Sequence, residues 1–152
     1  MNIDCPEKRF LEIIENAGAE EGMFGIKDGK VVSQIHKGGM FETVFLEVEF
    51  PNNSVYIISR LPLRVEHNYE RVMDLFKGLN KLDWLGGQFV IDDDNIITFH
   101  AKCVFEDLMT ADNPFKIIFS GCNAFDFCQL AILKTVSGAK LLIVDDWDKT
   151  NS

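Results

Sequence analysis

Strict alternation of apolar and polar residues in the first half of the chain predicts a block of antiparallel strands. The clearest case is 42–50, where Val44, Leu46 and Val48 share one face. Asp28-Gly29 suits a hairpin turn because both residues tolerate positive φ. The predicted strands are 23–27, 31–36, 42–50 and 54–60, with a turn at 51–53, and Pro62 ends the regular pairing because it has no N–H to donate.

Apolar residues at helical spacing predict three helices. The first covers 6–18, with Gly18 as its stop. The second follows Asn68, a residue type that favours the N-cap. The third begins within 110–113, with Asp112 as its cap, and runs to Ser137.

A second hairpin is predicted between the last two helices, from 88–91 and 96–105. The acidic run Asp92-Asp93-Asp94-Asn95 joins the two strands. In the longer strand the odd-numbered residues, Ile97 to Phe105, share one face, while His100 and its polar neighbours face the other way.

The resulting order, α-ββββ-α-ββ-α, is an α+β layout in which helices pack against an antiparallel sheet. The length of 152 residues fits one domain, 1–152. Its last part, 139–152, is interpreted as an edge strand at Leu141–Val144 followed by an acidic tail, although Leu141–Val144 can equally end a helical tail. Whether that strand pairs within the chain or across a dimer stays open.

Three segments together resemble the YbjN-like family of bacterial proteins, described as sensory transduction regulators. They are the helix end Leu79-Asn80-Lys81-Leu82, the strand Gly87-Gln88-Phe89-Val90-Ile91-Asp92, and the closing helix Asp112 to Gly138. The resemblance spans residues 7–138, and it departs at Gly38-Gly39 and after Lys140. It implies the fold of type III secretion chaperones, a small cytoplasmic homodimer and no known catalytic residues.

Composition restricts the partners. The chain carries 24 acidic and 15 basic residues, a net charge of −9, which repels phosphate backbones. We therefore expect binding neither to nucleic acid nor to anionic membranes. The first residues have no secretory pattern and no apolar run is long enough for a membrane span, so a cytoplasmic location is expected.

No motif of reaction chemistry is recognised, so no catalytic residue, cofactor or metal ligand is assigned. The four cysteines, Cys5, Cys103, Cys122 and Cys128, form no C-x-x-C pair and are expected to be reduced, three of them in or near the core. The histidines lack the spacing of a zinc site. The run Asp92 to Asn95 is interpreted as a solvated turn because it lacks the spaced ligands of a calcium loop.

Two features indicate protein binding. Trp84, with Leu82 and Leu85, is either an interaction patch or a cap on the core at the helix end. The third helix is apolar over more than one face, including Phe125 and Phe127, so it is deeply buried or shared with a second copy. The sequence favours a non-enzymatic adaptor or chaperone-like regulator that binds a protein client as a homodimer. The alternatives are a small-molecule sensor with a Phe-lined pocket and, after it, an enzyme with a dispersed site.

Overall fold

An antiparallel sheet organises the part of the chain that the computed structural model describes, residues 4–36, 41 and 43–137. Within these residues the sheet has six strands in the order β1-β2-β3-β4-β6-β5. The strands are β1 (Phe24–Lys27), β2 (Lys30–His36), β3 (Thr43–Glu49), β4 (Ser54–Arg64), β5 (Gln88–Ile91) and β6 (Ile96–Val104). The helices are α1 (Pro6–Asn16), α2 (Tyr69–Leu79), α3 (Phe105–Thr110), α4 (Phe115–Ile118) and α5 (Ser120–Ser137), with short 3-10 turns η1 (Pro51–Asn53) and η2 (Asp83–Leu85).

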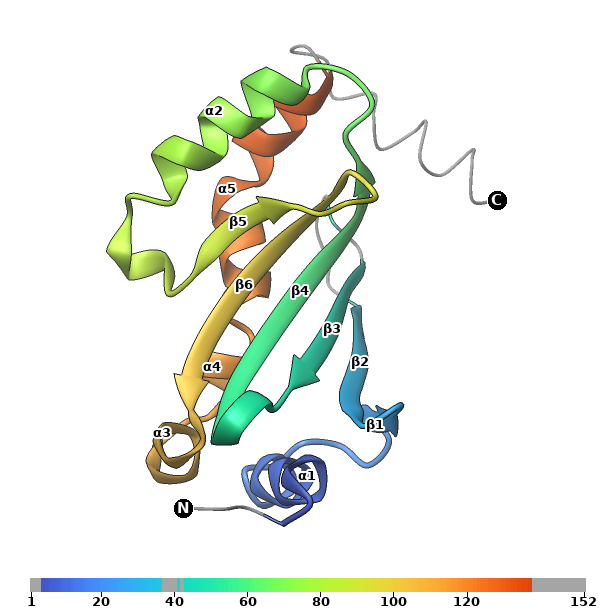
Figure 1. Cartoon of the computed structure of the whole chain (residues 1–152), viewed down its shortest axis with the longest axis vertical. Helices are drawn as coiled ribbons and strands as arrows, with labels where there is room; N and C mark the ends of the chain where they lie inside the picture. The colour runs from blue at the N-terminus through green and yellow to red at the C-terminus, as the bar shows by residue number, and fades with distance from the viewer. Residues whose placement is uncertain (1–3, 37–40, 42, 138–152) are drawn as a thin grey trace.

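The described helices lie on one side of the sheet and beyond its ends, so none of them covers its other face. In Figure 1 this uncovered face points toward the reader, and α5 and α4 run behind it. The covered face holds the core, where Phe10, Phe76, Phe99, Phe105 and Phe125 are almost fully buried and several of their rings meet edge to face. The expected α+β layout is confirmed.

Most of the predicted turns and faces are also confirmed. Asp28 and Gly29 both have positive φ, 53° and 75°, as a two-residue hairpin turn requires. Alternate residues of β3, beginning with Val44, are buried, and those between them face away from the core. Gly38-Gly39, where the resemblance to the YbjN-like family departs, and the predicted strand and tail after residue 138 lie outside the described residues.

The predicted third helix is wrong in its extent. The chain forms α3 from the last residue of the predicted strand, Phe105, through residues for which no element was predicted. The single predicted helix is broken at Phe119, which leaves helical geometry between α4 and α5. The cap also differs, because Asn113 Oδ1 rather than Asp112 accepts the backbone N–H of Phe115 at 3.1 Å. β4 is longer than predicted: it continues past Pro62 to Arg64, although its register with β6 shifts there.

Two asparagines at the ends of α2 bind distant backbone groups. Asn68 precedes the helix, as predicted, but its side chain makes no cap and instead donates to the carbonyl of Val136 at 3.3 Å. Asn80 follows the helix and lies at the free edge of β5. Its amide donates to the carbonyl of Phe89 at 3.0 Å and accepts the N–H of Phe89 at 2.7 Å. The end of α2 is therefore fastened to the edge of the sheet.

Candidate interaction surfaces

An exposed aromatic pair lies where η2 meets α5. Trp84 and Phe127 are 63% and 65% exposed, and their rings meet edge to face with centroids 4.8 Å apart. Leu130, one turn further along α5, is 50% exposed. We call Trp84, Phe127 and Leu130 the aromatic patch. Of the two sequence interpretations of Trp84, the structure excludes the one in which it closes the core.

The other predicted surface residues are placed differently. Leu85 and Phe125 are buried, Phe125 completely, so they belong to the core and cannot contact a partner directly. Leu82 is partly buried and packs against the core. The structure thus brings Trp84 and Phe127 together and separates them from Leu85 and Phe125. Leu130, which the sequence analysis did not select, completes the patch.

The exposed side of α5 explains why this helix is apolar over more than one face. Its core side carries residues such as Cys122, Phe125 and Ile132, which are buried. On the opposite side Phe127, Leu130 and Ala131 are exposed together. A second apolar side on one helix fits contact with another protein surface.

The uncovered side of the sheet is the second candidate surface, and we call it the open face. Its residues are the alternate positions of the strands that point away from α5, so it is a continuous surface across the sheet. Phe45, 42% exposed, lies near its centre. The sequence predicted the alternation in single strands but did not indicate which side of the sheet the helices would leave uncovered.

Charged residues of both signs line the open face. Lys30 Nζ lies 2.9 Å from Glu49 Oε1 and 3.3 Å from Glu47 Oε1. Both hydrogen bonds raise the pKa of Lys30, and the bond to Glu49 has the larger effect. Arg60 Nε lies 3.6 Å from Asp92 Oδ2, an ion pair longer than a hydrogen bond. Among the described residues no ion pair is found for the remaining cations of this face, Lys27, Arg64 and Lys102.

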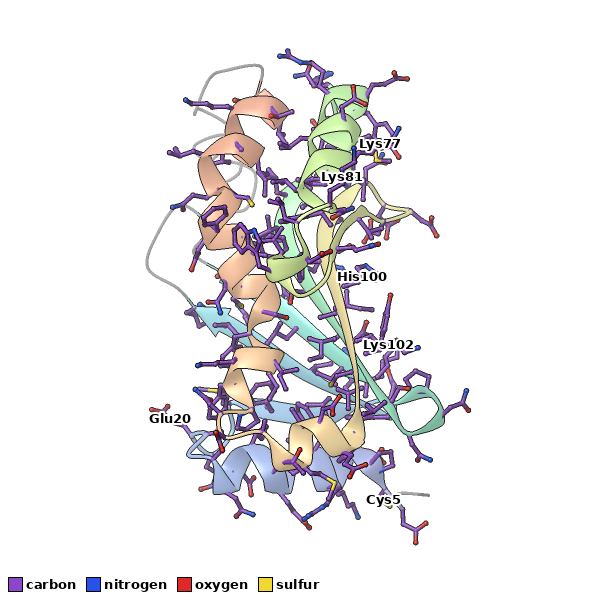
Figure 2. All side chains as sticks on the ribbon, turned by 90° about the vertical axis from the view of Figure 1, so that its left-hand side faces the viewer. Cys5, Glu20, Lys77, Lys81, His100 and Lys102 are labelled. Carbon is purple, nitrogen blue, oxygen red and sulfur yellow. The ribbon has the colours of Figure 1, made fainter. Side chains whose placement is uncertain are left out.

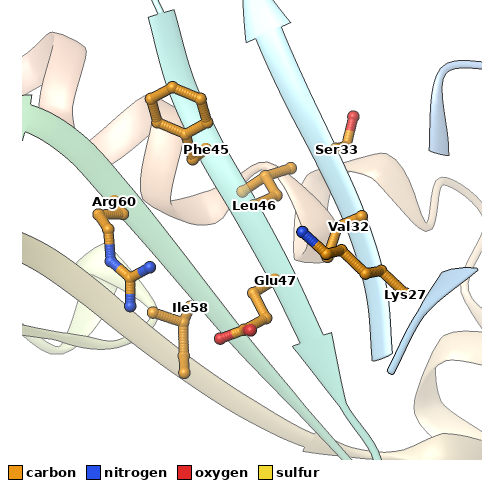
Figure 3. Close-up of a pocket in the computed structure, with 8 residues that line it drawn as sticks. All are labelled: Lys27, Val32, Ser33, Phe45, Leu46, Glu47, Ile58 and Arg60. Atoms are coloured by element: carbon orange, nitrogen blue, oxygen red, sulfur yellow. The ribbon is translucent and has the colours of Figure 1, made fainter. Parts of the chain in front are cut away.

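A shallow groove of about 420 Å³ runs over the open face. Its apolar floor includes Val32, Phe45 and Ile58, while Lys27 and Arg60 lie at opposite sides of it (Figure 3). Glu47, which is paired with Lys30, also lines the groove. The groove therefore combines an apolar floor with cations at its sides and one carboxylate that is already paired.

A chain of hydrogen bonds crosses the open face beside this groove. Tyr56 Oη lies 2.6 Å from His100 Nδ1, His100 Nε2 lies 2.8 Å from Thr98 Oγ1, and the Thr98 hydroxyl donates to the carbonyl of Val90 at 2.8 Å. Because the Thr98 hydroxyl donates its proton to the carbonyl of Val90, its oxygen must accept the Nε2–H of His100. The other ring nitrogen, Nδ1, then accepts the hydroxyl proton of Tyr56. The neutral imidazole satisfies every member of the chain. His100 and Lys102 both point to the side away from α5 (Figure 2).

His100 predicts a pH dependence of stability. Burial, followed by the positive charge of Arg60, lowers the pKa of His100 below its usual value of about 6.5. Below about pH 6.5 the histidine at position 100 takes up a proton in the unfolded chain more readily than in the folded chain. The free energy of unfolding therefore falls as the pH falls through the pKa of His100 in the folded protein.

Urea denaturation at a series of pH values between 5 and 7.5 measures this effect. We expect the free energy of unfolding to decrease less steeply toward pH 5 in His100→Gln than in the native protein. The control is His67→Gln, at an exposed histidine, which should keep the native decrease. An unchanged slope in His100→Gln would contradict the neutral assignment.

Three further candidates for chemistry, Cys103, Cys128 and Asp92, lie in environments that oppose reactivity. Burial raises the pKa of the Cys103 and Cys128 thiols, which keeps them from being nucleophilic thiolates. None of the four cysteines, all of which lie in the described part of the chain, forms a disulfide. Asp92 Oδ1 accepts the N–H groups of Asp94 and Ile96, each at 2.9 Å, so this carboxylate holds its own turn together. Across the described residues no group of three or more His, Cys, Asp or Glu side chains is placed to hold a metal ion.

Comparison of the chain with protein-family models, curated proteins and solved structures found no match. Within residues 4–36, 41 and 43–137, none of the helices is long and apolar enough to cross a membrane.

Proposed function

We propose that the protein is a non-enzymatic adaptor that binds a protein client and acts as a homodimer. The observation that carries the proposal is the aromatic patch, in which Trp84 and Phe127 are each exposed by more than 60% and contact one another. Tryptophan and other large aromatic side chains contribute most when they are desolvated at the centre of an interface. The resemblance to the YbjN-like family, which implies a dimer without known catalytic residues, supports the same proposal.

The exposed side of α5 fits a second copy of itself. In a two-fold dimer the same surface of both copies meets, so two α5 helices that cross antiparallel place Phe127 of one copy against Leu130 of the other. Ala131 has a small side chain on this side and permits a close approach. Trp84 flanks the contact from η2. The arrangement buries the aromatic patch of both copies at the centre of the interface.

The chemistry of the other surfaces supports a binding role over a catalytic one. Both nitrogens of His100 are held in hydrogen bonds to Tyr56 and Thr98. The thiols of Cys103 and Cys128 have raised pKa values. A catalytic base or nucleophile needs the opposite conditions, a free nitrogen or a stabilised thiolate.

Removal of the aromatic patch is expected to abolish the dimer. We expect the native protein to have twice the 17.3 kDa chain mass by light scattering, and the variant Trp84→Ser with Phe127→Ser to have the mass of one chain at about 50 µM. Losing two central aromatic side chains costs roughly 2 kcal/mol or more each, enough to weaken association at least a thousandfold.

A matched control replaces exposed apolar residues elsewhere. Tyr69 on α2 and Met109 on α3 are 46% and 38% exposed. The variant Tyr69→Ser with Met109→Ser should keep the dimer mass. A native protein that remains monomeric at about 200 µM, a concentration far above the Kd of a stable dimer, would reject the proposed assembly.

A further inference from the structure

The charge of the open face is opposite to that of the protein. Its described residues include five cations, Lys27, Lys30, Arg60, Arg64 and Lys102, and three anions, Glu47, Glu49 and Asp92, a net charge of +2. The whole chain has a net charge of −9. The acidic excess therefore lies elsewhere, and the sheet presents a weakly positive, partly apolar surface. Such a surface complements an acidic partner.

The spacing of the unpaired cations indicates the size of that partner. Lys27 is on β1 and Lys102 is on β6, which are separated by β2, β3 and β4. Neighbouring strands lie about 4.8 Å apart, so these two strands are roughly 19 Å apart. An extended peptide of about six residues has this length. A small metabolite does not reach both cations, but an extended segment lying across the strands does.

The registers place Lys30, Glu49 and Tyr56 in the row between these two lysines, and the groove supplies an apolar contact beside that row. Val32, Phe45 and Ile58 form its floor, between Lys27 on one side and Arg60 on the other (Figure 3). Aliphatic residues of a bound segment can exclude water from this floor, while carboxylates of the same segment form ion pairs with Lys27 and Lys102. Addition of a strand at the edge of β5 does not compete at Phe89, because Asn80 already occupies the N–H and C=O groups there.

We infer that the open face binds an extended segment of a client protein that combines acidic and aliphatic residues. This inference rests on the proposed adaptor function and names the chemistry of its client. The acidic side chains pair with Lys27 and Lys102, and the aliphatic side chains contact Val32 and Ile58, the part of the apolar floor beside the row that joins the two lysines. Nucleic acid is a poorer occupant, because the acidic remainder of the chain repels a continuous phosphate backbone.

The experiment measures fluorescence anisotropy of labelled ten-residue peptides. One peptide alternates aspartate with valine and the other alternates lysine with valine. We expect the acidic peptide to bind, and its binding to weaken when salt is raised from 0.05 to 0.5 M, because the contacts are screened. The basic peptide should not bind.

Two charge-reversal variants separate the open face from general charge effects. Lys27→Glu with Lys102→Glu should weaken binding of the acidic peptide about tenfold or more. Lys8→Glu with Lys116→Glu changes net charge equally, on α1 and α4, and should change the affinity about twofold or less. Circular dichroism checks that both variants fold.

Failure of this inference is distinguishable from failure of the dimer. The peptide titration is repeated on the Trp84→Ser with Phe127→Ser variant, whose open face is intact. This variant should bind the acidic peptide with unchanged affinity even when its mass is that of one chain. No acidic-peptide binding at about 1 mM, or an equal loss in both charge-reversal variants, overturns the inference. So does preferential binding of a single-stranded oligonucleotide, or of a peptide copy of residues 141–148, which would assign the open face to nucleic acid or to a segment of the chain itself.

Discussion

Gly121→Ala is expected to destabilise the protein by about 3 kcal/mol or more, because α5 lies too close to β4 for any side chain at this position. A Cβ on Gly121 would lie 2.4 Å from the Cβ of Ser59, and its hydroxyl would be closer still. Ser59 is 1% exposed and belongs to a central strand, so neither partner can move without separating the helix from the sheet. Denaturation in guanidinium followed by circular dichroism measures the change in the free energy of unfolding.

A compensating variant tests the cause of this loss. Ser59→Gly removes the atoms that a Cβ on Gly121 would meet, leaving Phe99 Cδ1 at 3.4 Å as the nearest neighbour. We expect the double variant to be more stable than the sum of the single changes predicts, by about 2 kcal/mol. Gly78→Ala is the control in α2, where a Cβ would meet nothing within 4 Å. It should stabilise the protein by up to about 1 kcal/mol through helix propensity. Additive effects at positions 59 and 121 would contradict the steric explanation.

Gly87→Ala is expected to cost about 3 kcal/mol or more for a related reason at the start of β5. A Cβ at this position would lie 2.3 Å from the backbone oxygen of His100 and 2.6 Å from the ring of Phe99. The ring cannot withdraw, because it is fully buried and packs edge to face against Phe89 and Phe125. Relief of the clash therefore requires β5 to move away from β6.

The control for this change is Gly25→Ala in β1, where a Cβ would meet nothing within 4 Å. Its free energy of unfolding should remain within about 0.5 kcal/mol of the native value. The same denaturation measurement compares the two variants. A Gly87→Ala protein as stable as Gly25→Ala would show that the β5–β6 contact is looser than the structure indicates.

These glycines show what the sequence can and cannot predict. A glycine pair such as Gly86-Gly87 is typical of a turn, and Gly86 has the positive φ, 81°, that explains a glycine there. Gly87 is required for a different reason, the close approach of another strand. For Gly121, helix propensity alone indicates only a weaker helix than alanine would give. Positive φ belongs to local turn chemistry, whereas a close approach depends on which distant residue the fold places opposite, and no local pattern contains that information.

The errors in the elements have the same origin. The apolar stripe at helical spacing continues past Phe119, from Phe115 and Ile118 to Cys122, so hydrophobic periodicity contains no signal for the break between α4 and α5. The aromatic patch was predicted in part, because Trp84 and Phe127 stand out as large apolar residues at unusual positions. The link between Tyr56 and His100 joins residues 44 positions apart, and only the pairing of β4 with β6 brings them together.

The hydrogen bonds of Asn80 have a consequence for how copies of this chain can assemble. A sheet edge with free backbone groups can recruit further strands one after another, and such growth has no natural end. On the β5 edge, a side-chain amide already occupies both backbone groups of Phe89, as a neighbouring strand would. Fibril-like growth is thereby blocked at this position. At this position of the β5 edge, copies are left to associate through contacts between side chains, whose shape sets a finite number of subunits; the opposite edge of the sheet is β1.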